Sequence, residues 1–144
     1  MRFFVFLVCL FFLFGCVQEQ PVKISELCFQ EGKCIQLEKA VTIEEQIKGL
    51  SFRENLPENS GLMFPLQEER IPRFWMKDML FPIDIVWIDS KKEIVGWAQE
   101  MSPCTPEKCE TVSPLQPVKY VLEVNSGFME KNFIKVGEKV DFDE

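Results

Sequence analysis

Pro82-Ile83-Asp84-Ile85-Val86-Trp87-Ile88-Asp89 is the stretch that decides the fold. Its residues alternate with the period of a β-strand, so that one face carries Ile83, Ile85 and Trp87 and the other Asp84, Val86 and Ile88. The polar run at 89–92 predicts a turn, after which 93–98 returns as an antiparallel partner. The middle of the chain is therefore expected to be a β-sheet.

Further short elements surround this strand. Thr42-Ile43-Glu44-Glu45 is a capping box, which predicts a helix of about two turns that ends at Gly49, and a second short helix is expected at 128–132. Other strands are expected at 22–29, 34–41, 62–64, 73–77 and 118–124, with a strand pair in 134–142. Pro65 is expected to end the strand at 62–64. The pattern predicts a mainly β (α+β) fold, a small compact barrel-like sheet domain with two short helices.

The N-terminus is typical of an exported lipoprotein. Met1-Arg2 precedes an apolar run from Phe3 to Phe14, which fits a signal peptide and is short for a bilayer span of about 20 residues. Leu13-Phe14-Gly15-Cys16 then suits cleavage before Cys16 and lipidation of its thiol. We expect a signal peptide at 1–15, a lipid-anchored tether at 16–26 and one globular domain at 27–144.

Two other interpretations of the N-terminus remain open, an ordinary secretory peptide and an uncleaved anchor. In each of them the domain is exported. The lipoprotein interpretation predicts anchoring through Cys16 to the outer face of the cytoplasmic membrane or to the outer membrane.

Four further cysteines predict two disulfides. In an exported chain the even number favours pairing, and proximity favours Cys28 with Cys34 and Cys104 with Cys109, although three connectivities are possible. A four-cysteine zinc site is disfavoured because the first spacing is wider than zinc ligands usually have. Redox exchange at Cys104 and Cys109 is a weaker alternative, since thiol oxidoreductases favour Cys-x-x-Cys.

Composition excludes several classes of function. The chain has no histidine, which removes Ser-His-Asp and Cys-His nucleophile systems and histidine-ligated zinc. Loss of Arg2 with the signal leaves 15 basic against 23 acidic side chains, so 15 − 23 = −8. An acidic surface argues against nucleic acid as a partner. We predict no metal or cofactor, and a monomer.

The candidate binding residues are Arg53, Trp75, Lys77, Asp78 and Asp84. Trp75 with a neighbouring cation suits a pocket for a sugar ring or a planar ligand, although a half-buried strand explains the same pattern. Asp84 lies within an apolar strand, where a carboxylate needs partners. It is either a site carboxylate or, as we favour, half of a structural ion pair with Arg53, Arg73 or Lys77.

All of these candidates except Asp78 also belong to an ordered series of motifs. The series is Glu45, Gly49-Leu50-Ser51-Phe52-Arg53, Leu56-Pro57, Gly61-Leu62-Met63-Phe64, Phe74-Trp75-Met76-Lys77, Pro82-Ile83-Asp84-Ile85, Tyr120-Val121-Leu122-Glu123 and Gly137-Glu138. Over roughly 34–142 the chain resembles the domain-of-unknown-function 192 family, with departures at Ser51 and Asp78-Met79. The resemblance implies a small, mostly β domain and no established activity.

Two functions are compatible with the sequence. The first is a non-catalytic module, anchored to a membrane through Cys16, that binds a small ligand, a glycan or an envelope partner. The alternative is a carboxylate-based hydrolase that acts on cell-envelope material. A glycoside hydrolase needs two carboxylates about 5–10 Å apart in an open cleft, whereas a binder needs an aromatic side chain and a cation along a groove.

Overall fold

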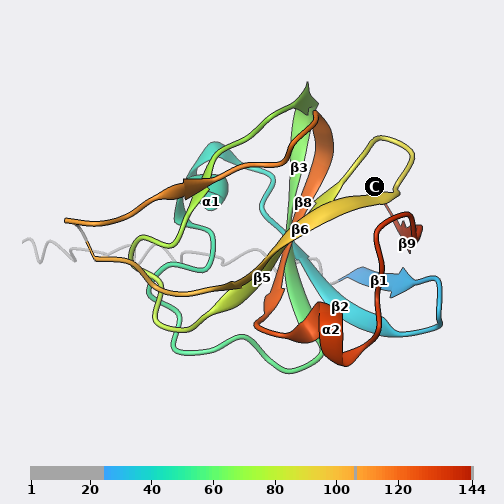
Figure 1. Ribbon diagram of the computed structural model, residues 1–144, viewed down its shortest axis with the longest axis horizontal. Coiled ribbons are helices and arrows are strands. Elements are labelled where there is room, and N and C mark those ends of the chain that lie inside the picture. Colours follow the sequence, from blue (N-terminus) through green and yellow to red (C-terminus); the bar gives the residue numbers. More distant parts are fainter. Residues whose placement is uncertain (1–24, 106, 144) are drawn as a thin grey trace, which may run out of the picture.

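The computed structural model describes residues 25–105 and 107–143 of the chain. The predicted signal peptide, Cys16 and most of the predicted tether lie outside the described residues. The elements, labelled in Figure 1, are β1 (Ser25–Phe29), β2 (Cys34–Lys39), α1 (Ile43–Lys48), β3 (Ser60–Arg70), β4 (Phe74–Trp75), β5 (Ile83–Ile88), β6 (Ile94–Met101), β7 (Thr111–Val112), β8 (Val118–Asn125), α2 (Phe128–Lys131) and β9 (Val140–Phe142).

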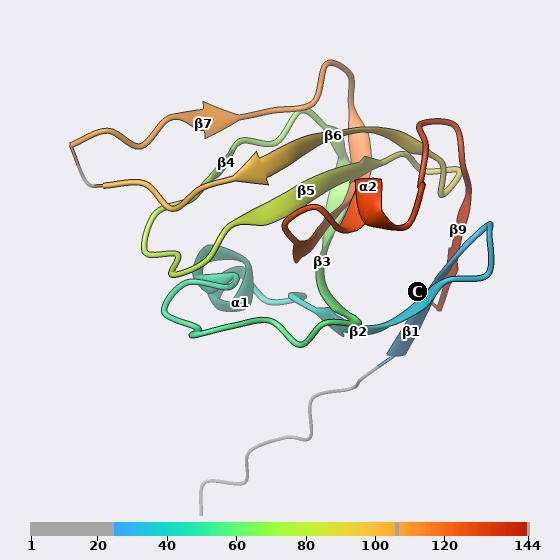
Figure 2. The same ribbon diagram turned by 60° about the horizontal axis from the view of Figure 1, so that its bottom comes forward.

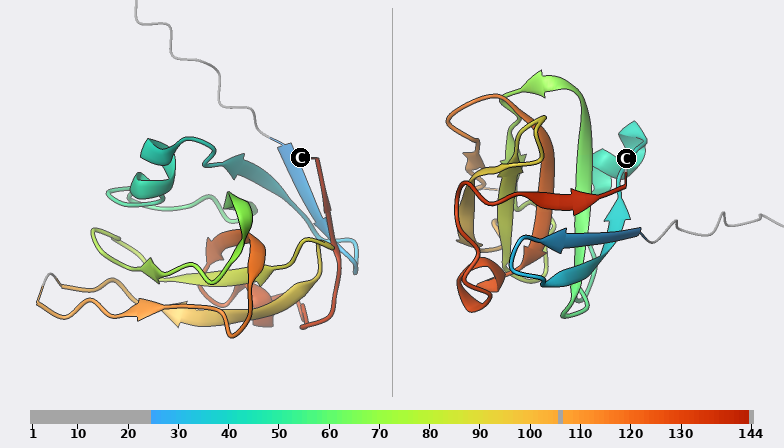
Figure 3. Two further views of the ribbon diagram at one scale, coloured as in Figure 1. Left: turned by 90° about the horizontal axis from the view of Figure 1, so that it is seen from above. Right: turned by 90° about the vertical axis from the view of Figure 1, so that its right-hand side faces the viewer.

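Seven of these strands form one sheet in the order β6-β5-β8-β3-β2-β1-β9. The sheet curls into a half-barrel, which the left view of Figure 3 shows nearly end-on. All neighbours are antiparallel except β2 and β3, which are parallel and are joined through α1. A parallel pair needs such a crossover connection. The predicted mainly β, barrel-like fold with two short helices is confirmed.

The strand that decides the fold, β5, lies between β6 and β8 and is buried on both faces. Ile83, Ile85 and Trp87 pack into one apolar cluster, while Val86 and Ile88 pack into a second one on the opposite face. The alternation predicted from the sequence is therefore confirmed, although neither face meets water.

The prediction that Pro65 ends a strand is wrong. β3 continues to Arg70, and Pro65 pairs with Tyr120 of β8. The parallel pairing with β2 stops at Met63, so no strand on that side requires an N–H from residue 65. Proline is tolerated at such an edge because no ladder hydrogen bond is lost.

The C-terminal segment holds one strand instead of the predicted pair. β9 pairs with β1, and the residues before it bond to the start of β6. Ile94 N–H donates to the carbonyl of Glu138, and the N–H of Gly137 donates to the carbonyl of Ile94, each at 2.8 Å. Hydrogen bonds thus join the two ends of the sheet at one point.

Two disulfides are present, Cys28–Cys34 and Cys104–Cys109, as predicted. The alternative interpretation of these four cysteines as a zinc site is therefore wrong. The disulfides indicate an oxidising, extracytoplasmic compartment. Among the described residues, no helix is long and apolar enough to cross a membrane.

Two small pieces of the fold lie at the open end of the half-barrel. α1 lies on one side of the opening, and the two-stranded sheet of β4 and β7 lies on the other, as Figures 2 and 3 show. α2 lies elsewhere and adds Phe128 and Met129 to the cluster of Val86. The open end between α1 and β4 holds the candidate site.

Candidate functional site

Helix α1 forms one wall of the site. The predicted capping box is present: Glu45 N–H donates to the Thr42 hydroxyl at 3.2 Å, and the Glu45 carboxylate accepts from Thr42 N–H at 2.8 Å. The helix buries none of its side chains, so it is held by polar contacts. Gln46 supplies two of them, because its amide donates to the carbonyls of Ala40 and Pro65 at 3.1 Å each.

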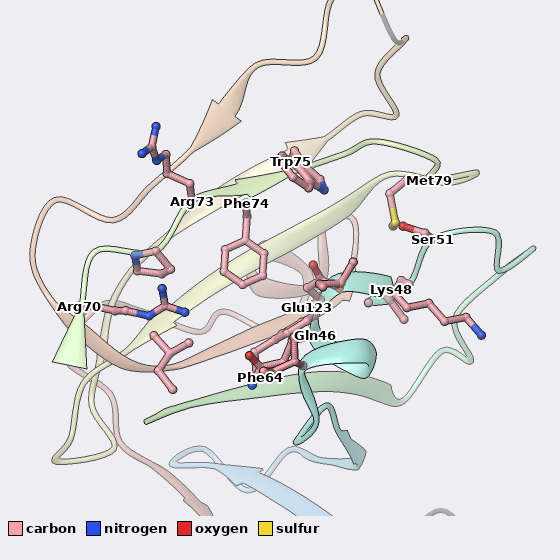
Figure 4. A pocket seen from close by; sticks show the side chains of 16 residues that line it. Gln46, Lys48, Ser51, Phe64, Arg70, Arg73, Phe74, Trp75, Met79 and Glu123 are labelled. Carbon is pink, nitrogen blue, oxygen red and sulfur yellow. The ribbon is translucent and has the colours of Figure 1, made fainter. Parts of the chain in front are cut away.

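The wall opposite α1 consists of aromatic side chains. Phe74 packs edge-on against Phe64, with ring centroids 5.1 Å apart, and also against Trp87 at 5.8 Å. Trp75, next to it on β4, is 55% exposed. These walls enclose a pocket of about 270 Å³, which we call the Glu123 pocket after the residue at its centre in Figure 4.

Glu123 is the unusual residue of this pocket. It lies on β8, pairs with Ile85 of β5 and is 5% exposed. Its Oε2 has no hydrogen-bond partner among the described residues. Burial raises the pKa of Glu123 to about 8, against a smaller opposing effect of Arg53. With this pKa, the protonated form of the carboxyl group predominates at neutral pH, and this form can donate a hydrogen bond.

Sequence reasoning missed Glu123 as a site residue. The signal was present, because a carboxyl in the apolar strand 118–124 is the same anomaly that singled out Asp84. Alternation also places it on the face of Val121, which lies in the cluster that borders the pocket.

Three cations surround the mouth of the pocket. Arg70, the last residue of β3, extends towards the interior, while Arg73 and Lys48 point away from it on opposite sides (Figure 4). Within the described part of the chain, none of the three forms an ion pair; the ion pairs found there are Arg53–Glu38 and Lys131–Glu58. The pocket mouth is thus positive on a protein of net charge −7.

A second hollow adjoins the Glu123 pocket. We call this space of about 410 Å³ the Phe52 groove, and three of the predicted site residues line it: Trp75, Lys77 and Asp78. Phe52 and Asp78 both have left-handed backbone conformations, with φ of 63° and 59°. The N–H of Phe52 donates to the carbonyl of Asp78 at 2.8 Å. This hydrogen bond joins the loop after α1 to the loop after β4.

Arg53 lies outside both hollows. Its guanidinium donates two hydrogen bonds to the carboxylate of Glu38 on β2, at 2.9 and 3.0 Å. A bidentate pair of this kind fixes the orientation of both groups. Arg53 therefore affects the site only through its charge, which lowers the pKa of Glu123.

Asp84 is a structural residue whose partners differ from those predicted. It is fully buried, and in the described chain it pairs with backbone N–H groups instead of Arg53, Arg73 or Lys77. Glu100 N–H and Gly127 N–H donate to one oxygen at 2.9 and 3.1 Å, and Met129 N–H donates to the other at 3.2 Å. Glu100 lies at the irregularity of β6, and Gly127 and Met129 lie at the start of α2. One carboxylate thus joins β5, β6 and α2.

Comparison with known proteins finds a matching family model and similar solved structures. A family model described as DUF192, "Uncharacterized ACR, COG1430", matches residues 27–142. A protein from Sinorhizobium meliloti 1021, described as a "putative transcription regulator", is 25% identical with a TM-score of 0.73, and the match covers 82% of this chain and 91% of that one. A protein of unknown function from Novosphingobium aromaticivorans DSM 12444 is 27% identical with a TM-score of 0.74, over 85% and 89%. No curated protein matches the chain.

Replacement of Asp84 tests its structural role. We expect Asp84→Ala to lower the free energy of unfolding by about 3 kcal/mol or more, because three buried N–H groups lose a charged acceptor. Asp141→Ala, an exposed aspartate on β9, is the matched control and should change it by less than about 0.5 kcal/mol. Urea unfolding measures both, and equal losses in the two variants would contradict the assignment.

The protonated state of Glu123 predicts a pH dependence of stability. Between the ordinary pKa of 4.5 and the folded-state pKa of about 8, only the unfolded chain releases this proton, so rising pH favours unfolding. The dependence ends above about 8, where both states are ionised. Each pKa unit corresponds to about 1.4 kcal/mol, so the loss amounts to several kcal/mol.

Glu123→Gln removes this component, so its free energy of unfolding should fall less than that of the wild type between pH 5 and pH 8. Glu31→Gln, in the exposed β1–β2 turn, should keep the wild-type slope. Parallel curves for Glu123→Gln and wild type would show that Glu123 is already ionised in the folded protein at neutral pH.

Proposed function

This chain belongs to the DUF192 family, whose members are uncharacterised, and we propose that it is a lipid-anchored extracytoplasmic module that binds a small ligand in the Glu123 pocket. One observation carries the proposal: the carboxyl oxygen Oε2 of Glu123 is buried and without a partner beside a pocket that opens to solvent. A polar atom in this position costs about 1–3 kcal/mol of folding free energy. A ligand that bonds to it recovers that cost.

The aromatic wall supports a binding role. Phe74 is fixed by edge-on contacts with Phe64 and Trp87, which are both buried, and therefore presents a rigid surface. Trp75 remains 55% exposed beside it. Exposed flat side chains next to a few polar groups are typical of small-molecule sites.

The hydrolase alternative has less support. Cleavage of glycosides generally uses two carboxyl groups about 5–10 Å apart. Glu123 is the one carboxyl group among the residues that line its pocket, and it is protonated at neutral pH. A cation, aromatic rings and a single carboxyl group favour binding over this reaction.

Nucleic acid is not the ligand that we propose. The words "transcription regulator" describe the Sinorhizobium protein. The present chain has a net charge of −7, whereas nucleic-acid binding requires clustered Lys and Arg. Its three cations at the pocket mouth suit a small ligand.

The lipid anchor is the second part of the proposal. The sequence before Cys16 supports it, and the two disulfides support export. Eight residues lie between Cys16 and Ser25 of β1, and this connection spans at most about 30 Å when fully extended. The pocket would then work within a short distance of a membrane surface.

A thermal-shift screen tests the binding role. We expect some envelope glycans or small metabolites to raise the melting temperature of the wild-type protein, and Trp75→Ala to lose most of this increase because the ligand contacts the aromatic wall. Phe133→Ala, an exposed aromatic residue away from the pockets, should keep it. Ligands that stabilise Trp75→Ala as strongly as wild type would place binding elsewhere, and turnover of the ligand seen by mass spectrometry would favour the hydrolase.

Replacement of Cys16 tests the anchor. We expect the wild-type chain to fractionate with membranes and to carry lipid that mass spectrometry detects, and Cys16→Ser to lose both properties. Cys9→Ser is the matched control, because Cys9 lies within the predicted signal peptide and leaves with it. Lipid on the Cys16→Ser protein would contradict the anchor.

A further inference from the structure

We propose that the ligand of the Glu123 pocket is a small organic anion with a flat ring, whose acidic group bonds to Arg70 and which accepts a hydrogen bond from the Glu123 carboxyl. The inference rests on the proposed function and adds the chemical class of the ligand. It follows from three features of the pocket: its free cations, its neutral carboxyl group and its size.

The free cations favour an anion. Arg70, Arg73 and Lys48 lie around the pocket mouth, and none of them has a carboxylate within 4.0 Å among the described residues. On a chain with more acidic than basic side chains, three unpaired cations at one opening create a local positive potential. Such a field attracts anions and repels cations.

Arg70 is positioned to contact the acidic group. It ends β3 after the irregularity that follows Pro65, and its guanidinium extends towards the pocket interior in Figure 4. A guanidinium presents a planar set of donors that matches carboxylate or phosphate oxygens. Arg73 and Lys48 point outwards and act through their charge.

Glu123 selects against cations for a second reason. A protonated carboxyl group has no charge with which to hold an ammonium group, but it donates an O–H to a carboxylate, phosphate or carbonyl oxygen. Ionisation of Glu123 would instead place a negative charge beside the anion. The anion should therefore bind the form of the protein in which Glu123 is protonated. Its affinity should decrease above about pH 8.

The other charged groups around Glu123 do not reverse this expectation. The cations around Glu123 are Arg70 from β3, which extends into the pocket, Lys48 from α1 and Arg73 before β4, which point outwards, and Arg53, which lies outside the pocket. Arg53 is already paired with Glu38, and its effect on the pKa of Glu123 is smaller than that of burial. An added anion compensates the remaining cations, so it does not force ionisation of Glu123.

The volume limits the ligand to about one ring with its substituents. At about 270 Å³, the pocket lies just below the range of about 300–1,000 Å³ that is typical of sites for drug-sized molecules. Phe74 and Trp75 offer faces against which a planar ring stacks. Benzoate combines such a ring with a carboxylate and is a suitable probe.

The experiment compares three probes that share one ring and differ in charge: benzoate, benzyl alcohol and benzylamine. Saturation-transfer NMR titrations use the exported full-length chain, purified as it occurs in the cell, at pH 6.5. We expect benzoate to bind about tenfold more tightly than the other two, a difference of about 1.4 kcal/mol. Arg70→Ala should lose this preference, while Lys91→Ala, an exposed lysine in the β5–β6 turn, should keep it.

A pH series supplies the second measurement. Benzoate affinity for the wild type should fall about tenfold by pH 9, one unit above the pKa of Glu123, because only the protonated form binds well. In Glu123→Gln, which keeps a neutral donor at the same place, the affinity should stay constant over this range. Melting temperatures of the variants establish that each one is folded.

The outcomes separate this inference from the proposed function. Tighter binding of benzylamine would overturn the anion class, and unchanged benzoate binding in Arg70→Ala would overturn the contact with Arg70. Either result would leave the pocket as a ligand site. If none of the probes binds while the thermal-shift screen identifies a Trp75-dependent ligand, the class is wrong and the proposed function stands. If both experiments fail, both proposals are wrong.

Discussion

A buried carboxyl group must either find hydrogen-bond donors or keep its proton, and this constraint governs both halves of the structure. Asp84 and Glu123 lie on adjacent strands, in the neighbouring cross-strand pairs Asp84–Val124 and Ile85–Glu123. Because side chains alternate, the two carboxyl groups face opposite sides of the sheet. Asp84 receives three backbone N–H groups, whereas Oε2 of Glu123 receives none from the described residues.

Because of this difference, one face of the sheet has a structural role and the other holds the candidate site. On the Asp84 side, one carboxylate holds the irregular edge of β6 and the start of α2 against β5, which makes that side rigid. On the Glu123 side, α1 buries no side chain and leaves space over the sheet. An unpaired polar group is a local violation of the rules for stable cores, and such violations concentrate at functional sites.

Much of the fold was predictable because its signals are local. The period of two in Pro82–Asp89, the capping box at Thr42 and Glu45 and the short spacing of the cysteine pairs each define structure within a few residues. The path of β3 through Pro65 was not predictable, because it depends on β2 leaving that edge unpaired. The pairing of the strand at Val140 was predicted wrongly for a similar reason. Its partner is β1, at the other end of the chain, and not a neighbouring strand within 134–142.

The candidate site was predicted only in part. Trp75, Lys77 and Asp78 share a groove because they are near one another in sequence. The pairing of Arg53 with Glu38 depends on the crossover that brings β2 and the loop after α1 together, and no local pattern reports it. Asp84 and Glu123 gave the same sequence signal, a carboxyl group in an apolar strand, and only their surroundings in three dimensions separate a structural group from an available one.

The hydrogen bonds between the segment before β9 and the start of β6 have a consequence for the behaviour of the protein among its own copies. An open sheet presents an unpaired strand at each end, and such edges template edge-to-edge aggregation. Here the N–H and carbonyl groups of Ile94 are already occupied by Glu138 and Gly137, and the N–H of Val140 by the carbonyl of Lys92. The half-barrel thus protects its edges where they meet. That protection matters most where copies are crowded together, as the proposed lipid anchor would hold them in the plane of a membrane.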